Sequence, residues 1–278
     1  MAKTGRKVKG LRVGDRVLVH YIVSCGRCAY CNANQENYCV KYQMVGKDVD
    51  GGFAEYVRVP ARSIVKLPES IPFDQGAIMG CAVPTAFHAL KRAKVRPGDT
   101  VVVFGVGGLG IHAVQLATRI FRAGAVVAVD LADWKLKQAK QVGAKETVNP
   151  LTQDAANVVH KITDGKLADV VLDFVGVNQT IGQAIDCVGK GGRFALVGIG
   201  AKSMQISPYT TIIGKEMEII GVDDHLKTEL VQLVRLVRSR KLDLSRSVTH
   251  RVRLEDINTG FRILEDSSEN PIRVVALT

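Results

Sequence analysis

The stretch from residue 100 to residue 130 constrains the fold more than any other part of the sequence. It opens with a run of β-branched and aromatic side chains over residues 101–104, which is typical of a strand buried on both faces. Glycines at the G-x-G-x-x-G spacing follow directly: Gly105, Gly107 and Gly110. Apolar positions between residues 111 and 121 fit a helix, and a second apolar run ends at Asp130. This order predicts a strand, a glycine turn, a helix and a second strand.

Each glycine in this turn has a physical role in binding a dinucleotide. The first allows the tight turn, the second lets the backbone approach a pyrophosphate, and the third lets the helix pack closely on the strand. The helix N-terminus then presents N–H groups to the phosphates. An acidic residue about twenty positions further on, here Asp130, accepts hydrogen bonds from the adenosine ribose. The sequence therefore predicts a dinucleotide site at Gly105, Gly107, Gly108, Leu109, Gly110 and Asp130.

Beyond residue 100 the sequence alternates between short apolar strands and helices. We expect strands at residues 100–104, 125–129, 146–148, 168–174, 193–197 and 217–222. We expect helices at residues 109–121, 133–142, 154–163, 178–188 and 207–213. Parallel strands joined by crossover helices predict an α/β fold with a doubly wound Rossmann sheet. We assign this domain to residues 90–223.

The segments on either side of that domain have a different pattern. Residues 51–68 alternate over 54–59 and indicate a small β-rich region, and residues 72–79 and 81–92 read as helical. After the sheet we expect a helix at 227–241, a strand at 248–254, a helix at 255–265 and a closing strand at 273–277.

Composition excludes several classes of protein. The formal net charge is +11, but basic residues are scattered and aromatic residues make up only 5% of the chain, so we expect no nucleic-acid partner. A positive field would instead attract an anionic dinucleotide. No apolar run approaches the about eighteen residues of a membrane span, and the N-terminus has no signal-peptide pattern. We expect a cytoplasmic protein with no membrane partner.

Four of the six cysteines fall within fifteen residues, at Cys25, Cys28, Cys31 and Cys39. Four thiolates suit tetrahedral Zn²⁺, and a site with no open position is structural. An iron–sulfur cluster also uses four cysteines, but the spacing differs from the ferredoxin pattern. Disulfides would conflict with the expected compartment. We therefore favour structural zinc, whereas Cys81 and Cys187, taken alone, read as small buried residues.

Several motifs together resemble the zinc-containing medium-chain alcohol dehydrogenases over nearly the whole chain. They are G-L-R-V-G-D-R-V (10–17), the cysteine lobe (25–39), G-G-F-A-E-Y-V (51–57), G-V-G-G-L-G (105–110) and V-L-D-F-V-G (171–176). The resemblance implies that residues 1–89 form part of a GroES-like catalytic domain, which residues 224–278 complete. It also implies hydride transfer to NAD, interconverting alcohols and aldehydes or ketones, in a cleft between two domains, with a second zinc that polarises the alcohol oxygen.

The resemblance also assigns roles to single residues. Cys81 aligns with a ligand of the catalytic zinc, and Thr85 with a residue beside the nicotinamide. Asp130 and Lys135 match the pair at the adenosine ribose, which favours NAD over NADP. The remaining matches are Val175 and Gly198, in loops that line the nicotinamide, and Arg273, which reaches the pyrophosphate.

One part of the family pattern has no counterpart here. Relatives carry the first catalytic cysteine, part of the proton relay and a Gly-His-Glu motif upstream of the segment that matches Gly10, whereas residues 1–9 contain neither cysteine nor histidine. Nothing in the spacing recommends His20, His88 or His112 as substitutes. We therefore expect an N-terminally truncated chain. The alternative function is an NAD-binding fragment that holds only the structural zinc and is impaired in catalysis.

Two further expectations concern relatives of this kind. A zinc-free quinone reductase is disfavoured, because that branch generally lacks both the cysteine lobe and the equivalent of Cys81. Relatives form homodimers or homotetramers by joining edge strands of their Rossmann sheets, and residues 217–222 could do so here. The sequence does not indicate which alcohol or carbonyl compound is the substrate.

Overall fold

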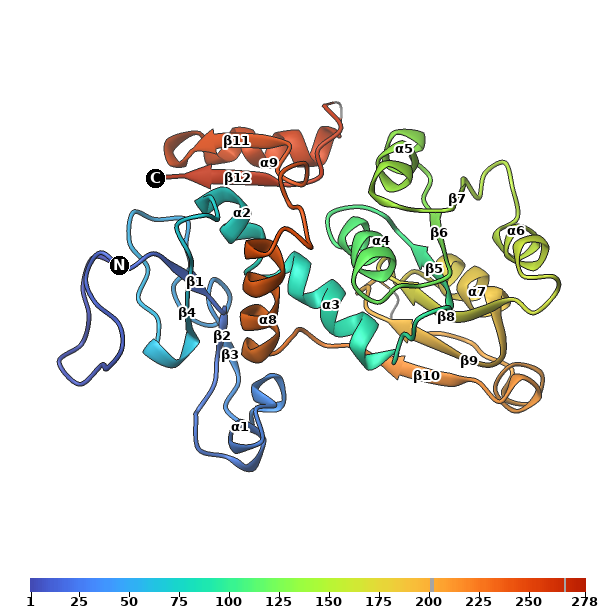
Figure 1. The fold of residues 1–278 in the computed structure, drawn as a ribbon, viewed down its shortest axis with the longest axis horizontal. Coiled ribbons are helices and arrows are strands. Elements are labelled where there is room, and N and C mark those ends of the chain that lie inside the picture. Colours follow the sequence, from blue (N-terminus) through green and yellow to red (C-terminus); the bar gives the residue numbers. More distant parts are fainter. Residues whose placement is uncertain (201–202, 268) are drawn as a thin grey trace. The chain divides into compact units, whose positions relative to one another are not determined.

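The computed structural model describes residues 1–200, 203–267 and 269–278. The chain divides into two units (Figure 1). The first combines Met1–Pro84 with Asp224–Thr278, and the second is Thr85–Asp223. The division falls within α3 (Ala82–Arg92). In the described ranges, no helix is long and apolar enough to cross a membrane.

Within the described residues, the second unit is built around one sheet of six strands. Its order is β10-β9-β8-β5-β6-β7, and all neighbouring pairs are parallel. The strands are β5 (Thr100–Phe104), β6 (Ala125–Val129), β7 (Glu146–Val148), β8 (Ala168–Asp173), β9 (Val188–Leu196) and β10 (Glu218–Gly221). The order runs outward in both directions from β5, so the predicted doubly wound sheet is confirmed. The strand order reverses between β5 and β8, which is where such sheets bind ligands.

One strand differs clearly from the prediction. The expected strand at 193–197 begins at Val188, directly after the preceding helix. Val188 pairs with Ala168, and after a register shift the regular pairing of β9 with β8 begins with Arg193 opposite Val170. Gly189, between these two points, permits a close approach to the neighbouring segment, since a Cβ atom there would lie 2.3 Å from the carbonyl oxygen of Lys166.

Helices cover both faces of this sheet (Figure 1). On one side α4 (Gly110–Arg119) and α5 (Asp133–Val142) contact β5, β6 and β7. On the other, α6 (Ala155–Ile162) and α7 (Asn178–Cys187) pack together, and a short π-helix, η3 (Pro208–Ile213), precedes β10.

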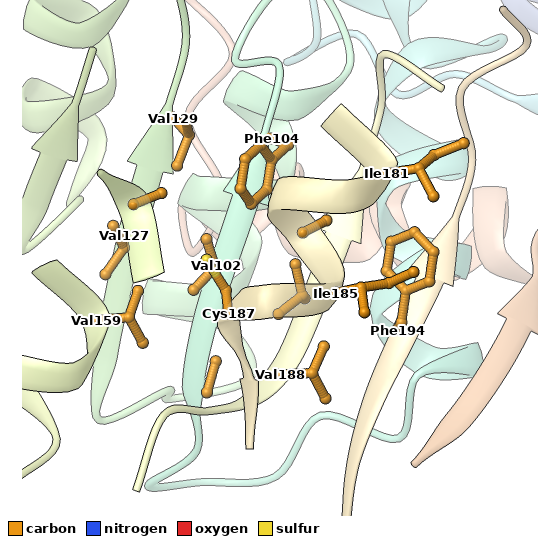
Figure 2. Close-up of a cluster of buried hydrophobic side chains, with 14 of the residues drawn as sticks. Val102, Phe104, Val127, Val129, Val159, Ile181, Ile185, Cys187, Val188 and Phe194 are labelled. Carbon is orange, nitrogen blue, oxygen red and sulfur yellow. The ribbon is translucent and has the colours of Figure 1, made fainter. Parts of the chain in front are cut away.

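A cluster of buried apolar side chains lies between α6, α7 and the sheet (Figure 2). It includes Val102, Phe104, Val127, Val129, Val159, Ile181, Ile185, Cys187, Val188 and Phe194. Alternate residues of β5 and β6 contribute to it, as the two-residue period of a strand requires. Burial of each large side chain contributes about 1.5–3 kcal/mol. Cys187 is a core residue, as the sequence predicts.

The first unit contains three two-stranded sheets among its described residues. Antiparallel pairs join β1 (Val17–Val19) to β4 (Ile64–Lys66) and β2 (Ile22–Val23) to β3 (Gln43–Met44). The parallel pair is β11 (His250–Arg253) with β12 (Val274–Leu277), and α9 (Ile257–Asp266) packs on it. The other elements are α1 (Ala29–Asn32), η1 (Glu36–Tyr38), η2 (Ala61–Ser63), α2 (Phe73–Ile78), α8 (Lys227–Arg238) and η4 (Leu254–Asp256).

The β-rich region expected at residues 51–68 contains β4, but its alternating segment, residues 54–59, is not a strand. This segment is irregular, and Tyr56 is 74% exposed, as is the preceding Phe53 at 67%. An alternating pattern produces a strand only where another strand supplies hydrogen bonds and a surface to pack against. No strand in the described part of the chain pairs with it.

A buried ion pair ties three segments of the second unit together. Arg193, on β9, donates from Nη1 to the carbonyl oxygens of Ala93 (3.1 Å) and Lys94 (2.6 Å), which directly follow α3. Its Nη2 lies 3.0 Å from Oδ2 of Asp99, just before β5. The two side chains are only 11% and 13% exposed. Arg193 therefore holds the end of α3 and the entry to β5 against β9.

We predict that Arg193→Met destabilises the second unit by about 2–4 kcal/mol, because it removes the guanidinium group that pairs with a buried carboxylate and donates to two carbonyl oxygens. The control is Glu218→Gln, which breaks the exposed Lys94–Glu218 pair and should cost less than about 1 kcal/mol. Denaturant unfolding followed by the fluorescence of Trp134, the one tryptophan and a residue of α5, measures both. Equal stabilities of the two variants would contradict this account.

Candidate functional site

The loop between β5 and α4 has the shape that the glycine spacing predicts. Gly105 has φ +78°, in the left-handed region, and its N–H donates to the carbonyl oxygen of Val129 at 2.8 Å. A Cβ atom on Gly110 would lie 1.9 Å from the carbonyl oxygen of Gly105, so only glycine lets α4 begin this close to β5. A Cβ atom on Gly107 would meet only Nζ of Lys135, at 4.0 Å. The outer side of the loop is therefore open at Gly107.

The rest of this loop leads directly into α4. Gly108 lies on the turn, and Leu109 is the residue that precedes the first turn of the helix. The carbonyl oxygens of Gly107 and Leu109 accept hydrogen bonds from the N–H groups of Ile111 (3.1 Å) and His112 (3.0 Å). The helix N-terminus, with its partial positive charge, consequently lies beside the open position at Gly107.

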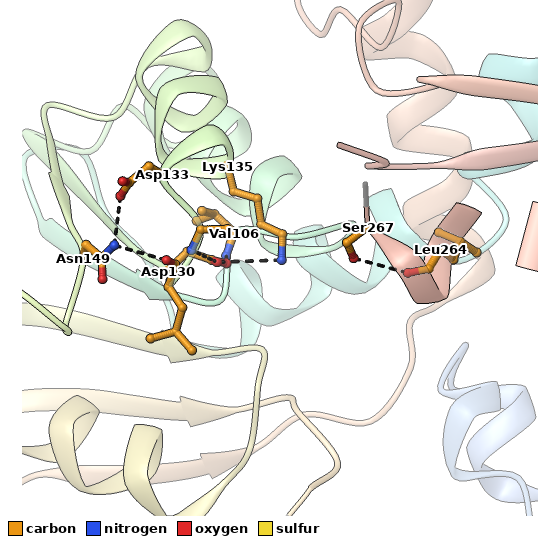
Figure 3. Close-up of polar contacts among 9 residues, drawn as sticks. Val106, Asp130, Asp133, Lys135, Asn149, Leu264 and Ser267 are labelled. Carbon is orange, nitrogen blue, oxygen red and sulfur yellow. Dashed lines mark hydrogen bonds and ion pairs between the residues drawn. The ribbon is translucent and has the colours of Figure 1, made fainter. Parts of the chain in front are cut away.

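Asp130 links this loop to the one after β6 (Figure 3). Its Oδ2 accepts a hydrogen bond from the N–H of Val106 and its Oδ1 from the N–H of Ala132, both at 3.0 Å. Nζ of Lys135 lies 3.7 Å from Oδ1. The Asp130 side chain is 10% exposed and that of Lys135 29%. A carboxylate and an ammonium group thus lie together at the edge of the open loop.

A third strand end supports the loop that carries Asp130. Nδ2 of Asn149, which follows β7, donates to the carbonyl oxygen of Leu131 (3.1 Å) and to Oδ1 of Asp133 (2.8 Å), as Figure 3 shows. Asn149 was not among the residues predicted from the sequence. Its position in the sequence could have indicated it, because it directly follows β7. This strand neighbours β6, which ends beside Asp130.

The two loop residues expected at the nicotinamide lie side by side beyond β8 and β9. A Cβ atom on Gly198 would be 2.3 Å from the carbonyl carbon of Val175. A Cβ atom on Gly105 would be 2.5 Å from Cγ2 of Val175. The structure therefore brings Gly105, Val175 and Gly198 together at the carboxyl edge of β5, β8 and β9. Asp173, at the end of β8, is fully buried there and was not singled out from the sequence.

The four cysteines of the lobe converge. Their Sγ atoms all lie within 4.8 Å of one another, with 3.5 Å between Cys28 and Cys31 and 3.9 Å between Cys25 and Cys31. Sulfurs around a tetrahedral zinc, at Zn–S of about 2.3 Å, are about 3.8 Å apart. The arrangement therefore fits zinc. In the described part of the chain, it is the only group of three or more such ligands.

Backbone N–H groups direct their hydrogens at this cluster. The N–H groups of Arg27 and Cys28 lower the pKa of Cys25 to about 6, and that of Cys31 lowers the pKa of Cys28. Burial raises the pKa of Cys31 to about 11. Stabilised thiolates are the form of cysteine that binds metal.

Three further residues are expected at the site from the sequence: Cys81, Thr85 and Arg273. Cys81 is exposed, in the first unit, just before α3. Thr85 is buried on α3 in the second unit. Arg273 directly precedes β12 in the first unit, and burial lowers its pKa while the charge of Cys81 acts in the opposite direction. Cys81 is not a member of any cluster of three metal ligands among the described residues.

Comparisons with known proteins match two families in two segments of the chain. The family "Alcohol dehydrogenase GroES-like domain" matches residues 1–69, and the family "Zinc-binding dehydrogenase" matches residues 108–239. An alcohol dehydrogenase from Geobacillus stearothermophilus is 36% identical over 93% of this chain and 75% of that enzyme. An L-threonine 3-dehydrogenase from Pyrococcus horikoshii is 34% identical over 97% of this chain and 75% of that enzyme.

Solved structures share the fold. Alcohol dehydrogenase TADH from Thermus sp. ATN1 has a TM-score of 0.93 at 26% identity, over 99% of this chain and 81% of that one. An alcohol dehydrogenase from E. coli CFT073, in complex with NADH, has a TM-score of 0.89 at 25% identity, over 98% and 79%. A zinc-binding dehydrogenase from Sinorhizobium meliloti 1021, bound to NADP, has a TM-score of 0.86 at 27% identity, over 100% and 80%.

The cysteine cluster, the glycine loop on a doubly wound sheet and the matches in both segments agree with one another. This chain belongs to the zinc-containing medium-chain alcohol dehydrogenase family.

Proposed function

We propose that the protein binds NAD on its second unit, holds a structural zinc in its cysteine lobe, and interconverts alcohols with aldehydes or ketones. Membership of a family of oxidoreductases supports the reaction class. The observation that carries the cofactor assignment is the contrast between Gly110 and Gly107. Gly110 is required for packing, whereas the position beside Gly107 is open toward solvent and lies next to a helix N-terminus.

Different residues of the second unit would bind different parts of the dinucleotide. The loop 105–110 would receive the pyrophosphate, because its helix N-terminus favours negative charge. Asp130 and Lys135 would bind the adenosine ribose, and Val175 and Gly198 would line the nicotinamide. When bound, the nicotinamide ring supplies the hydride acceptor for alcohol oxidation.

The carboxylate of Asp130 favours NAD over NADP. Its oxygens are held by two backbone N–H groups and lie at the edge of the open loop. A 2′-phosphate on the ribose would meet this carboxylate, and like charges brought together destabilise binding. Among solved relatives, one binds NADH and another NADP, so family membership alone does not decide between the two.

The catalytic zinc would need its own set of ligands, distinct from the four cysteines of the lobe. Cys81 is the one described residue expected to bind it, and no cluster of three ligands includes Cys81. The described residues therefore do not make a catalytic zinc site. This observation favours a second candidate function, an NAD-binding protein with one structural zinc and impaired turnover. An assay of NAD reduction over a broad panel of alcohols with zinc supplied distinguishes the two: turnover supports the enzyme, and its absence supports the binding protein.

We predict that Gly107→Ala weakens NADH binding at least about tenfold, the equivalent of about 1.4 kcal/mol, because the new methyl group occupies the space a phosphate needs. It should leave stability unchanged, since that methyl group meets only the end of the Lys135 side chain. Gly182→Ala, on α7 with nothing within 4 Å, is the matched control. Energy transfer from Trp134 to bound NADH measures the NADH affinity of the two variants. Unaltered NADH affinity in Gly107→Ala would contradict the assignment.

We predict that the wild-type protein binds NADH at least about tenfold more tightly than NADPH, and that Asp130→Asn reduces this preference, because it removes the like-charge repulsion. Asp133→Asn is the control, since that carboxylate accepts from Asn149 and the substitution leaves Asp130 intact. Competitive titration with NADH and NADPH measures the ratio of the two affinities in each protein. Equal preference in the wild type and Asp130→Asn would show that the carboxylate does not select the cofactor.

We predict one tightly held zinc per chain, bound at the lobe. Metal analysis of Cys39→Ser should show its loss, because three thiolates leave the tetrahedron incomplete. Cys187→Ser is the control, since this cysteine lies in the apolar core. Removal of zinc by a chelator should unfold the lobe, whose polar filler has little apolar surface to bury. Full zinc retention in Cys39→Ser would contradict the assignment.

A further inference from the structure

Asp173 occupies the point where the strand order of the sheet reverses. It is the last residue of β8, next to β5, and it is fully buried. Ligands of doubly wound sheets bind outside the carboxyl ends of the strands at this point. A carboxylate in such a position costs free energy unless it is fully hydrogen-bonded.

The hydrogen bonds of Asp173 hold the loop that follows β8. Its Oδ1 accepts from the N–H groups of Val175 (2.8 Å) and Gly176 (3.1 Å). Its Oδ2 lies 2.9 Å from Oγ1 of Thr180, on the first turn of α7. One side chain therefore fixes both the loop and the start of the next helix.

The backbone of the same residue holds the loop that follows β9. The carbonyl oxygen of Asp173 accepts from the N–H groups of Val197 and Gly198, each at 2.9 Å. The two loops are then in direct contact, since a Cβ atom on Gly176 would lie 2.2 Å from the carbonyl oxygen of Gly198. The side chain of Asp173 thus holds the loop after β8, and its backbone carbonyl, which any residue would supply, holds the loop after β9.

This arrangement fixes Val175 over the glycine loop. Val175 packs against Gly105, and its side chain remains 38% exposed. It therefore presents an apolar surface at the carboxyl edge between β5 and β8. A nicotinamide ring has a flat face that such a surface can support, whereas the pyrophosphate and ribose belong to the neighbouring polar loops.

We propose that Asp173 is a positioning residue for the nicotinamide half of the cofactor site. Its side chain acts through the loop of Val175 and Gly176, against which Gly198 packs, and does not itself touch the dinucleotide. The inference rests on the proposed function, because it requires a dinucleotide whose adenosine end lies at Asp130.

The geometry distinguishes hydrogen bonding from charge. Oγ1 of Thr180 lies 2.9 Å from Oδ2 and also 3.0 Å from the carbonyl oxygen of Val177, and its single hydrogen can be donated to only one of them. In Asp173→Asn, Oδ1 can still accept from Val175 and Gly176, while Nδ2 donates to Thr180 and the hydroxyl donates to Val177. Asparagine therefore preserves the network, whereas alanine removes it.

The test compares the affinity for NADH with the affinity for ADP. ADP would occupy only the adenosine and phosphate half of the site. In Asp173→Ala we expect NADH affinity to fall about tenfold or more, the size typical of lost supporting contacts, with ADP affinity unchanged. The enhanced fluorescence of bound NADH should fall with it. Asp173→Asn should restore both readouts to near the wild-type values. Thr180→Val, which removes one support and no charge, should give a smaller loss of NADH affinity alone.

Unfolding curves followed by Trp134 fluorescence show which variants are folded. If Asp173→Ala does not fold, the two single variants Asp173→Asn and Thr180→Val still test the proposal. Equal losses of NADH and ADP affinity, unchanged NADH affinity in Thr180→Val and Asp173→Ala, or a loss in Asp173→Asn equal to that in Asp173→Ala would each overturn the proposal. Failure of the proposed function has a different signature, in which the wild-type protein binds neither ADP nor NADH.

Discussion

The close approach between Gly105 and Gly110 is the constraint on which the proposed cofactor site depends. A side chain at residue 110 would have to occupy the place of the Gly105 carbonyl oxygen, 1.9 Å away. Because both residues are glycine, α4 starts directly above the end of β5. This position leaves Gly107 open and brings the N–H of Val106 within reach of Asp130. Asp130 in turn supports the 105–110 turn through its hydrogen bond with Val106.

The two proposed ligand sites are stabilised in different ways. The cofactor loops of the second unit extend from strands whose side chains are buried in an apolar core, so their geometry is available before any ligand binds. The cysteine lobe has short helices and little apolar filling, and its four thiol groups converge on one point. Its folding free energy would come largely from metal binding. Loss of zinc and loss of cofactor should therefore have separate effects on stability.

Local patterns in the sequence predicted the sheet and its glycine loop, because buried parallel strands are nearly continuous apolar runs and the loop has a fixed spacing. The early start of β9 was not predicted, because the expected helix at 178–188 includes Val188, the first residue of the strand. The alternating segment 54–59 does not form a strand, because strand formation depends on distant partners. Asn149 and Asp173 were missed for a similar reason: their partners are largely backbone groups of loops, whose positions follow from the assembled sheet.

The central claim is that the dinucleotide half of the family's active site is preformed in the second unit. A crystal structure of the protein with NADH tests this most directly. The account predicts the pyrophosphate against residues 105–110, the adenosine ribose hydroxyls hydrogen-bonded to Asp130, and the nicotinamide ring against Val175, with the loops in the positions described above. Adenosine bound away from Asp130, or a rearranged loop at 105–110, would contradict it.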